Sequence, residues 1–309
     1  MMQIDMVPTG AMTARESVPA QPPVLAALQR VITALPRGRS RIARLLAGKL
    51  RGCFVAVVPP FNLDVRLAID PSDPFQAEIW LGAYQPHVVA FLMANVRAGS
   101  TVLCAGLHVG YIASIARRLA GPFGRVLTAE PDPIALECGR FNLRLGDPAR
   151  DAPIDVLGGG LSDEDATLEL HQSNVLGHSS FATSHHEATL THAQLRRGDD
   201  WLEERGVASV DVAVLDVEGW ELRALLGLRQ TLARSPQLVA LIELSGWALK
   251  DAGTSGPDVV AFLRSRGFDV RWASAHGHGC RYGVWGDRVE KGDEETANDV
   301  LCVGSGLRT

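Results

Sequence analysis

Residues 100–133 read Ser-Thr-Val-Leu-Cys-Ala-Gly-Leu-His-Val-Gly-Tyr-Ile-Ala-Ser-Ile-Ala-Arg-Arg-Leu-Ala-Gly-Pro-Phe-Gly-Arg-Val-Leu-Thr-Ala-Glu-Pro-Asp-Pro. A short apolar run begins at Val102 and ends at Gly106, and apolar residues from Tyr111 onward recur at helical spacing. A second apolar run ends on Glu130. The pattern predicts a β-α-β unit, and such units bind nucleotide-like ligands at the carboxyl ends of their strands.

The glycines and the acidic residue of this unit point to an adenosyl ligand. Gly106 and Gly110 lack a Cβ, so a ligand can approach the backbone closely. Glu130 follows the second strand, where a carboxylate can accept hydrogen bonds from both hydroxyls of a ribose. The glycine spacing is not the G-x-G-x-x-G of dinucleotide sites, which favours S-adenosylmethionine over a nicotinamide cofactor. Alternatively, the glycines only form a turn and Glu130 only neighbours a helix N-cap.

The composition predicts a globular chain of one large or two small domains. It has 309 residues, of which 46% are hydrophobic and 21% charged, and its net charge of -5 argues against a nucleic-acid-binding protein. Five scattered cysteines without C-x-x-C spacing indicate reduced thiols in a cytoplasmic protein without a zinc site. Because there is neither a long apolar run nor a basic-then-apolar leader, we expect no integral membrane association and no secretion. The oligomeric state stays open.

We divide the chain into a disordered leader (residues 1–23), an N-terminal cap (24–98) and a cofactor-binding domain (99–309). The helix expected at 40–50 is basic and amphipathic; its charged face is either simply solvated or touches a membrane or an acidic partner. Within the cap, the patterns also predict a helix at 24–35, paired strands at 54–58 and 63–69, and helices at 75–81 and 87–96.

Strands and helices alternate in the rest of the chain, which predicts a mostly parallel sheet. Three strands end on acidic residues, Glu130, Asp216 and Glu243, which therefore line one edge of the sheet unless each merely caps a helix. An irregular stretch at 172–184 is interpreted as a substrate loop. The further elements expected are strands at 154–157, 167–171, 210–215, 238–242, 268–272 and 300–303, and helices at 133–145, 199–205, 221–232 and 257–266.

From about residue 63 to residue 303 the chain resembles the FkbM family of S-adenosylmethionine-dependent methyltransferases. The most specific match is Asp216-Val-Glu-Gly, followed by Trp220 and Glu221. Other matching segments are 67–73, 106–111, 124–133, 141–142, 161–163 and 174–180. The resemblance implies an α/β fold, a Rossmann-like class I methyltransferase sheet of seven strands with one antiparallel. It also implies methylation of a hydroxyl, typically on a sugar or a secondary metabolite.

Four positions depart from the family's usual pattern. Its glycine turn commonly reads Asp-x-Gly-Ala-Asn-x-Gly, whereas this chain has Cys104, Leu107 and His108 at the Asp, Ala and Asn positions. A lysine usual two residues before Asp216 is Val214. The missing aspartate usually helps to hold the methionine ammonium, and losing such a bond costs roughly 1.5–3 kcal/mol, or about one to two decades of affinity. A catalytically degenerate binding protein with the methyltransferase fold is therefore the alternative function.

The resemblance also implies roles for individual residues. Gly106, His108 and Gly110 would pack on the methionine and ribose, and Glu130 would hold the ribose. Cys104 and Asp163 are further expected cofactor contacts. The cofactor would carry the reactive methyl group, so the protein mainly supplies binding and alignment.

A hydroxyl acceptor needs a base to take its proton. Asp216 is the predicted base and Glu218 the second catalytic residue, while Glu243, His185 and His186 are further candidates. The expected partner is a small-molecule or saccharide acceptor, with no nucleic acid involved. Two other interpretations remain open: a nicotinamide oxidoreductase built on the same β-α-β unit, and a metal site rather than a plain loop at His276, His278 and Cys280.

Overall fold

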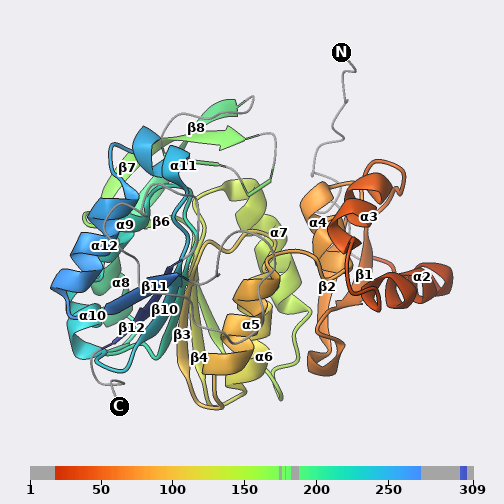
Figure 1. The fold of residues 1–309 in the computed structure, drawn as a ribbon, viewed down its shortest axis with the longest axis horizontal. Helices are drawn as coiled ribbons and strands as arrows, with labels where there is room; N and C mark the ends of the chain where they lie inside the picture. Colours follow the sequence, from red (N-terminus) through yellow and green to blue (C-terminus); the bar gives the residue numbers. More distant parts are fainter. Residues whose placement is uncertain (1–17, 174–175, 178, 182–187, 273–299, 305–309) are drawn as a thin grey trace.

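A computed structural model describes residues 18–173, 176–177, 179–181, 188–272 and 300–304 of the chain. Within them, the central sheet has the strand order β11-β12-β10-β9-β3-β4-β5, and β12 runs antiparallel to both of its neighbours (Figure 1). The remaining pairings are parallel. The mostly parallel sheet confirms the Rossmann-like α/β expectation. The strands are β3 (Thr101–Ala105), β4 (Arg125–Ala129), β5 (Ile154–Leu157), β9 (Val212–Leu215), β10 (Val239–Ile242), β11 (Asp269–Trp272) and β12 (Val300–Val303).

The strand order reverses beside β3. From β3 the chain passes through α6 (Tyr111–Ala120) to β4, and through α7 (Pro133–Arg144) to β5 on the same side. It then returns to β9 on the other side of β3. In an open α/β sheet, ligands bind at such a switch point, outside the carboxyl ends of the strands. The crevice predicted from residues 100–133 is therefore formed by β3, β4 and β9.

Alternate residues of the sheet strands enter two separate buried clusters. Cys104 belongs to the cluster that contains α6, α7 and α5 (Pro86–Asn95), whereas Leu103 belongs to the cluster on the opposite face. The helices of that opposite face are α8 (Gly198–Glu203), α9 (Glu221–Gly227), α10 (Arg229–Arg234) and α12 (Gly256–Ser265). Helices thus cover both faces of the sheet, as a parallel sheet requires.

The helix predicted at 221–232 is instead two helices, α9 and α10. The break falls where Gly227 approaches the backbone of β6 (Gly160–Ser162): a Cβ on Gly227 would lie 1.8 Å from the carbonyl oxygen of Ser162. This close approach stops α9, and the apolar periodicity of the sequence does not reveal it. The short helix α11 (Gly246–Asp251) was also not predicted.

The N-terminal cap contains a two-stranded antiparallel sheet and five short helical segments, one of which is α5. Phe54 pairs with Ile69 across β1 and β2. Residues 18–22, the end of the predicted leader, lie beside β1 instead of being disordered, because Val55 N–H donates to Pro19 (2.8 Å) and Gln21 N–H donates to Val55 (2.9 Å). The elements are α2 (Pro23–Thr33), α3 (Arg39–Leu46), β1 (Phe54–Val58), η1 (Phe61–Leu63), β2 (Val65–Ile69) and α4 (Pro74–Trp80). Residues 1–17 of the predicted leader lie outside the described part of the chain.

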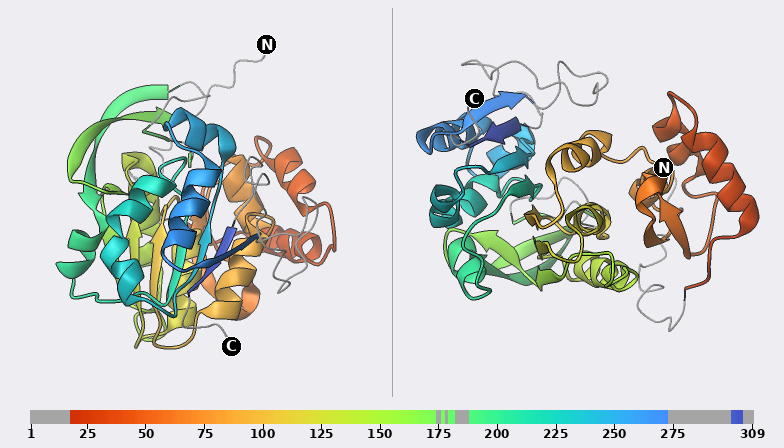
Figure 2. Two further views of the ribbon diagram at one scale, coloured as in Figure 1. Left: turned by 60° about the vertical axis from the view of Figure 1, so that its left-hand side comes forward. Right: turned by 90° about the horizontal axis from the view of Figure 1, so that it is seen from below.

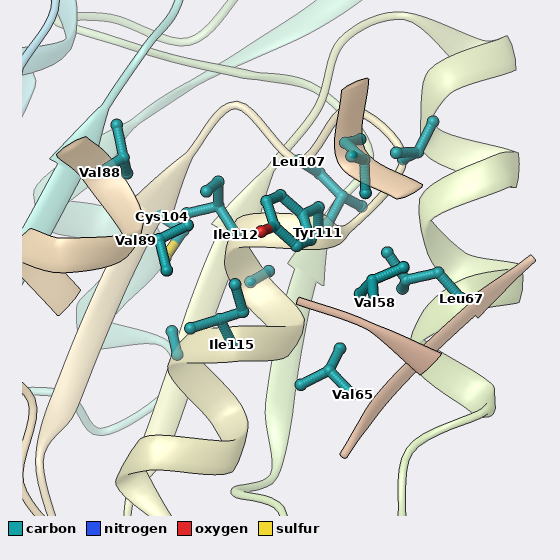
Figure 3. Packing of buried hydrophobic residues seen from close by; sticks show 14 of the residues in the cluster. Val58, Val65, Leu67, Val88, Val89, Cys104, Leu107, Tyr111, Ile112 and Ile115 are labelled. Atoms are coloured by element: carbon teal, nitrogen blue, oxygen red, sulfur yellow. The ribbon is translucent and has the colours of Figure 1, made fainter. Parts of the chain in front are cut away.

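One continuous core joins the cap to the sheet. Figure 3 shows Val58 and Leu67 of the cap close to Tyr111 of α6, and these side chains belong to one buried cluster. The hydroxyl of Tyr111 donates to the Pro59 carbonyl (2.8 Å). The side chain of Asn142 accepts from the N–H of Ala68 (2.7 Å) and donates to the carbonyl of Val109 in the glycine turn (2.8 Å). The cap is thereby fixed to the turn that forms the crevice.

A second sheet follows β5, with the order β6-β8-β7. It contains β7 (Ala166–Ser173) and β8 (Ala188–Arg197), which pair antiparallel, in addition to β6. β7 therefore extends into the stretch predicted to be irregular at 172–184. Residues 176–177 and 179–181 of that stretch are described, and its remaining residues, 174–175, 178 and 182–184, are not.

Candidate functional site

A cavity of about 320 Å³ lies at the carboxyl ends of the central strands. Small ligands occupy pockets of roughly 300–1,000 Å³ at such switch points. The cap, the glycine turn, the end of β4, the end of β9 and residues 176–177, 179 and 181 all contribute to its wall. The residues that line it include Phe75, Tyr84, Gln85, Gly106, His108, Glu130, Asp132, Leu176, Gly177, Phe181, Val214, Asp216, Glu218, Trp220 and Glu243.

The glycine turn brings the backbones of β3 and β9 into direct contact. Gly106 has φ +96°, and a Cβ there would lie 2.1 Å from the carbonyl oxygen of Asp216. His108 also has a positive φ, of 50°, and Gly110, with φ +85°, precedes the first residue of α6. Only glycine fits at position 106, and the backbone there is exposed to a ligand without an intervening side chain.

Glu130 is held at the end of β4 by backbone hydrogen bonds. Its Oε2 accepts from the N–H of His108 (2.8 Å) and its Oε1 accepts from the N–H of Asp132 (3.0 Å). Burial raises the pKa of Glu130 to about 7, against the opposing effect of these bonds. The N-cap of α7 is Asp132, which accepts from the N–H of Ile134 (2.7 Å). Glu130 is therefore not the helix cap, and each of its oxygens keeps a lone pair for a ligand.

Three carboxylates of the cavity wall lie close together. One oxygen each of Asp216, Glu218 and Glu243 lies within 4.8 Å of the others. Burial, followed by the charge of Asp216, raises the pKa of Glu218 to about 9. Gln85 of the cap donates from Nε2 to Asp216 Oδ2 (2.8 Å). The group is thus one oriented carboxylate beside a carboxyl that is protonated near neutral pH, and its oxygen donors are of the type that hard divalent cations also take.

The Asp-Val-Glu-Gly turn is held from within by Glu221. This side chain is completely buried, and its Oε1 accepts from the N–H groups of Val217 and Gly219, both at 3.2 Å. Burial raises the pKa of Glu221 to about 7. Gly219 has φ +95°, and a Cβ there would lie 2.4 Å from the carbonyl oxygen of Ala248. The most specific motif of the sequence therefore has a physical basis, because it fixes the turn that carries Asp216 and Glu218.

Aromatic side chains line two parts of the cavity wall. Tyr84 lies with its ring centroid 5.9 Å from that of His108 and 6.1 Å from that of Phe75. On the other side, the rings of Phe181 and Trp220 are 5.3 Å apart. These surfaces suit the stacking of a flat ring or the packing of a sugar face.

The cavity brings together most of the predicted site residues: Gly106, His108, Glu130, Asp216, Glu218 and Glu243 all line it. Gly110 lies one turn away, at the start of α6. His185, His186, His276, His278 and Cys280 lie outside the described residues.

Two predicted cofactor contacts do not line the cavity. Cys104 is buried within β3, and burial raises the pKa of its thiol to about 12, so it carries no charge. Asp163 instead pairs with Arg223 (2.9 Å). Conversely, Tyr84 and Gln85 line the cavity but were not predicted, because no motif marks them. The only signal in the sequence was the position of the cap directly before the first cofactor strand.

The chain is similar to several known methyltransferases and methyltransferase-like structures. The chain is 24% identical over 208 residues to the methyltransferase sdnD of Sordaria araneosa, covering 58% of this chain and 77% of that protein. Among solved structures, cofactor-bound Rv0187 from MTB is 15% identical, with a TM-score of 0.43 and coverage of 94% and 99% of the two chains. The O-methyltransferase TomG of Streptomyces achromogenes, solved with SAM, is 16% identical, with a TM-score of 0.41 and coverage of 72% and 80%. These structural likenesses are distant, and the fold assignment rests on the sheet order.

A family model described as the methyltransferase FkbM domain matches residues 105–270. The match begins at the last residue of β3, includes the glycine turn, Glu130 and the Asp-Val-Glu-Gly turn, and ends in β11. Because it covers more than half of the chain, this protein belongs to the FkbM methyltransferase family.

Proposed function

We propose that the protein is an S-adenosylmethionine-dependent methyltransferase that transfers a methyl group to a hydroxyl of a small molecule, either a sugar or a secondary metabolite. The observation that carries this proposal is the arrangement of the cavity. The bare glycine backbone and the buried Glu130 line the same cavity as the Asp216–Glu218–Glu243 carboxylates. A cofactor and an acceptor would then meet in this cavity.

The residues present fit S-adenosylmethionine. Gly106 lines the cavity without presenting a side chain to it, and Glu130 offers lone pairs for two ribose hydroxyls. Tyr84 and Phe75 provide apolar surface in the same cavity. None of the described residues that line the cavity is Lys or Arg, so its charge suits a cationic sulfonium ligand.

In this proposal the protein aligns the cofactor with the acceptor and removes the proton of the acceptor hydroxyl. Bound S-adenosylmethionine supplies an electrophilic methyl group. Asp216, oriented by its hydrogen bond from Gln85, takes the proton of the acceptor hydroxyl. Glu218 would stand beside this base as a carboxyl that is protonated near neutral pH. Phe181 and Trp220 would pack against the acceptor and exclude water.

Calorimetric titration with S-adenosylmethionine and with S-adenosylhomocysteine tests the cofactor. Glu130→Gln keeps the size of the side chain but presents an amide to backbone N–H donors, so affinity should fall about 10- to 100-fold. Asp163→Asn is the matched control, because Asp163 lies outside the cavity, and its affinity should be unchanged. The cofactor proposal fails if the unaltered chain binds neither compound at millimolar concentration.

Transfer is tested with methyl-labelled S-adenosylmethionine and a panel of polyhydroxylated and phenolic acceptors. Asp216→Asn retains an acceptor for the Gln85 amide but loses the base. Turnover should therefore fall roughly 10²- to 10⁴-fold, while cofactor affinity changes little. Full turnover in Asp216→Asn would remove Asp216 from the mechanism.

A second candidate function is binding without transfer. It is favoured by the uncharged Cys104 and Val214, which stand where the family usually has an aspartate and a lysine. This candidate predicts that the cofactor binds while no acceptor is methylated. Detectable transfer to any hydroxyl eliminates it.

A further inference from the structure

The charge of the chain is distributed very unevenly. Residues 24–51, which form α2, α3 and their flanks, contain seven basic residues and no acidic one. Because the whole chain has a net charge of -5, the remainder carries -12. Six of the seven basic residues are exposed: Arg30, Arg37, Arg41, Arg44, Lys49 and Arg51. Such a strongly cationic segment on an acidic protein is suited to an anionic surface.

α2 carries two apolar faces, and only one is used inside the protein. At 100° per residue, Leu25, Gln29 and Ile32 point in one direction, and Gln29 and Ile32 are buried. Val24, Leu28 and Val31 form a second line about a quarter turn away, and Leu35 follows just beyond the end of the helix; these four residues are called the α2 stripe. Val24 is 73% exposed and Val31 67% exposed, and the other two are also exposed. Three large apolar side chains of the helix, and a fourth just beyond its end, therefore face solvent.

The two helices lie at one end of the molecule. Figure 1 and the second view of Figure 2 both place α2 and α3 on the side of the cap that faces away from the central sheet. α3 adds Arg41, Arg44 and the 59%-exposed Leu45, which share one face by their helical spacing. The helix is fixed to α4 because Glu78 accepts from Ser40 Oγ (2.5 Å) and from Arg44 Nε (3.1 Å). The exposed face is thus presented on a fixed support.

We propose that α2 and α3 dock this protein peripherally on an anionic lipid membrane. The α2 stripe and Leu45 would enter the boundary between headgroups and acyl chains. The basic residues would contact the lipid phosphates, and their long side chains can reach outward while the apolar residues point inward. The acidic remainder of the chain is repelled by the same surface, which sets the orientation.

A lipid surface fits these features better than an acidic protein. A membrane accommodates a protruding apolar helix with basic residues spread around it. A protein partner would need a groove matched to the four side chains of the stripe. The proposal also agrees with the helix lengths, since no helix in the described residues is long and apolar enough to cross a membrane. It does not depend on the proposed enzymatic activity.

Vesicle co-sedimentation of the full chain tests this proposal. The probes are vesicles of phosphatidylcholine alone and vesicles of phosphatidylcholine mixed three to one with phosphatidylglycerol. Binding should require the anionic lipid and should weaken at high salt, which screens exposed charges. R37Q/R41Q/K49Q should reduce the partition coefficient about 100-fold, because each basic residue near an anionic surface contributes roughly fivefold. V24Q/V31Q should reduce it about 10-fold or more through lost apolar burial.

Matched controls separate this surface from general effects of charge or hydrophobicity. R140Q/R229Q/R234Q removes three exposed basic residues elsewhere, and Phe123→Gln removes an apolar residue that is 91% exposed between α6 and β4. Both should bind vesicles like the unaltered chain. Thermal unfolding checks that every variant is folded. Because the altered side chains are exposed, their replacement should not disturb the fold.

Three outcomes overturn the proposal. The first is no binding to the anionic vesicles, and the second is equal loss of binding in the control variants. The third is that V24Q/V31Q abolishes a concentration-dependent dimer in light scattering, or capture on a polyglutamate matrix, while leaving vesicle binding unchanged. The surface would then belong to a second copy of the chain or to an acidic protein.

Discussion

Gly106 gives the most direct test of how the crevice is built. In Gly106→Ala the new Cβ would lie 2.1 Å from the carbonyl oxygen of Asp216, whereas Cβ atoms essentially never come closer than 3.0 Å to another heavy atom. The ends of β3 and β9 must therefore move apart by about 0.9 Å, and both contacting atoms belong to rigid strand ends. Overpacking of this kind costs roughly 1–3 kcal/mol. The φ of +96° adds roughly 1–2 kcal/mol for a residue with a Cβ.

The expected loss of unfolding free energy is therefore about 2–5 kcal/mol, measured by urea denaturation at constant pH. Gly99→Ala is the control, because Gly99 has a similar φ of +89° but no atom within 4 Å of the added Cβ. It should lose only the roughly 1–2 kcal/mol of backbone strain. Cofactor affinity should fall in Gly106→Ala and stay constant in Gly99→Ala. Equal losses of stability in the two variants would refute the close approach of β3 and β9.

Three further predictions concern the surroundings of the cavity. Gln85→Glu replaces a donor by a fourth carboxylate beside Asp216, so turnover at neutral pH should fall at least 10-fold. The pH profile of turnover should move to higher pH, because a neighbouring like charge favours the protonated base, and an unchanged profile would contradict the contact. Glu221 has a folded-state pKa raised from 4.5 to about 7, so the folded chain binds the extra proton and stability falls as pH rises from about 5 to 8. In Glu221→Gln the free energy of unfolding, measured by urea denaturation at several pH values, should decrease with pH by up to about 3 kcal/mol less than in the unaltered chain. An unchanged dependence of this free energy on pH would contradict the prediction. Asp151→Asn breaks a buried pair with Arg118, which should cost about 3–5 kcal/mol, and a loss below about 1 kcal/mol by urea denaturation would show that the pair is not essential.

The sequence predicted the central sheet well because its strands are short apolar runs with distinct ends. β3, β4 and β9 each end at a glycine or an acidic residue, and these residues lie where the crevice forms. The second sheet was largely missed. β8 has only a weak alternation of polar and apolar residues, and its partner strand β7 was predicted to end two residues too early.

The sequence predicted the site residues that directly follow the ends of strands. It did not predict those that reach the cavity from distant parts of the chain. Asp216 and Glu243 end neighbouring parallel strands, so their proximity follows from topology alone. Gln85 reaches Asp216 across 131 positions of sequence, and its own segment has no catalytic motif. Conversely, Cys104 and Asp163 matched family positions, but their side chains point into the core or pair with Arg223, which motif matching does not detect.

The altered glycine turn does not by itself disable the site, because the contacts it makes are backbone contacts. His108 reaches Glu130 through its N–H, which any residue other than proline supplies. Leu107 is buried, and a larger side chain there changes the packing behind the turn rather than its hydrogen bonds. The departures that matter are those at Cys104 and Val214, where uncharged side chains replace the aspartate and lysine that are usual in the family. Asp216 and Glu243 still give the cavity wall acidic groups that a cationic cofactor would meet, whereas Glu218 is protonated near neutral pH. We therefore expect catalytic competence to depend on the carboxylates at the ends of β9 and β10 more than on the glycine turn.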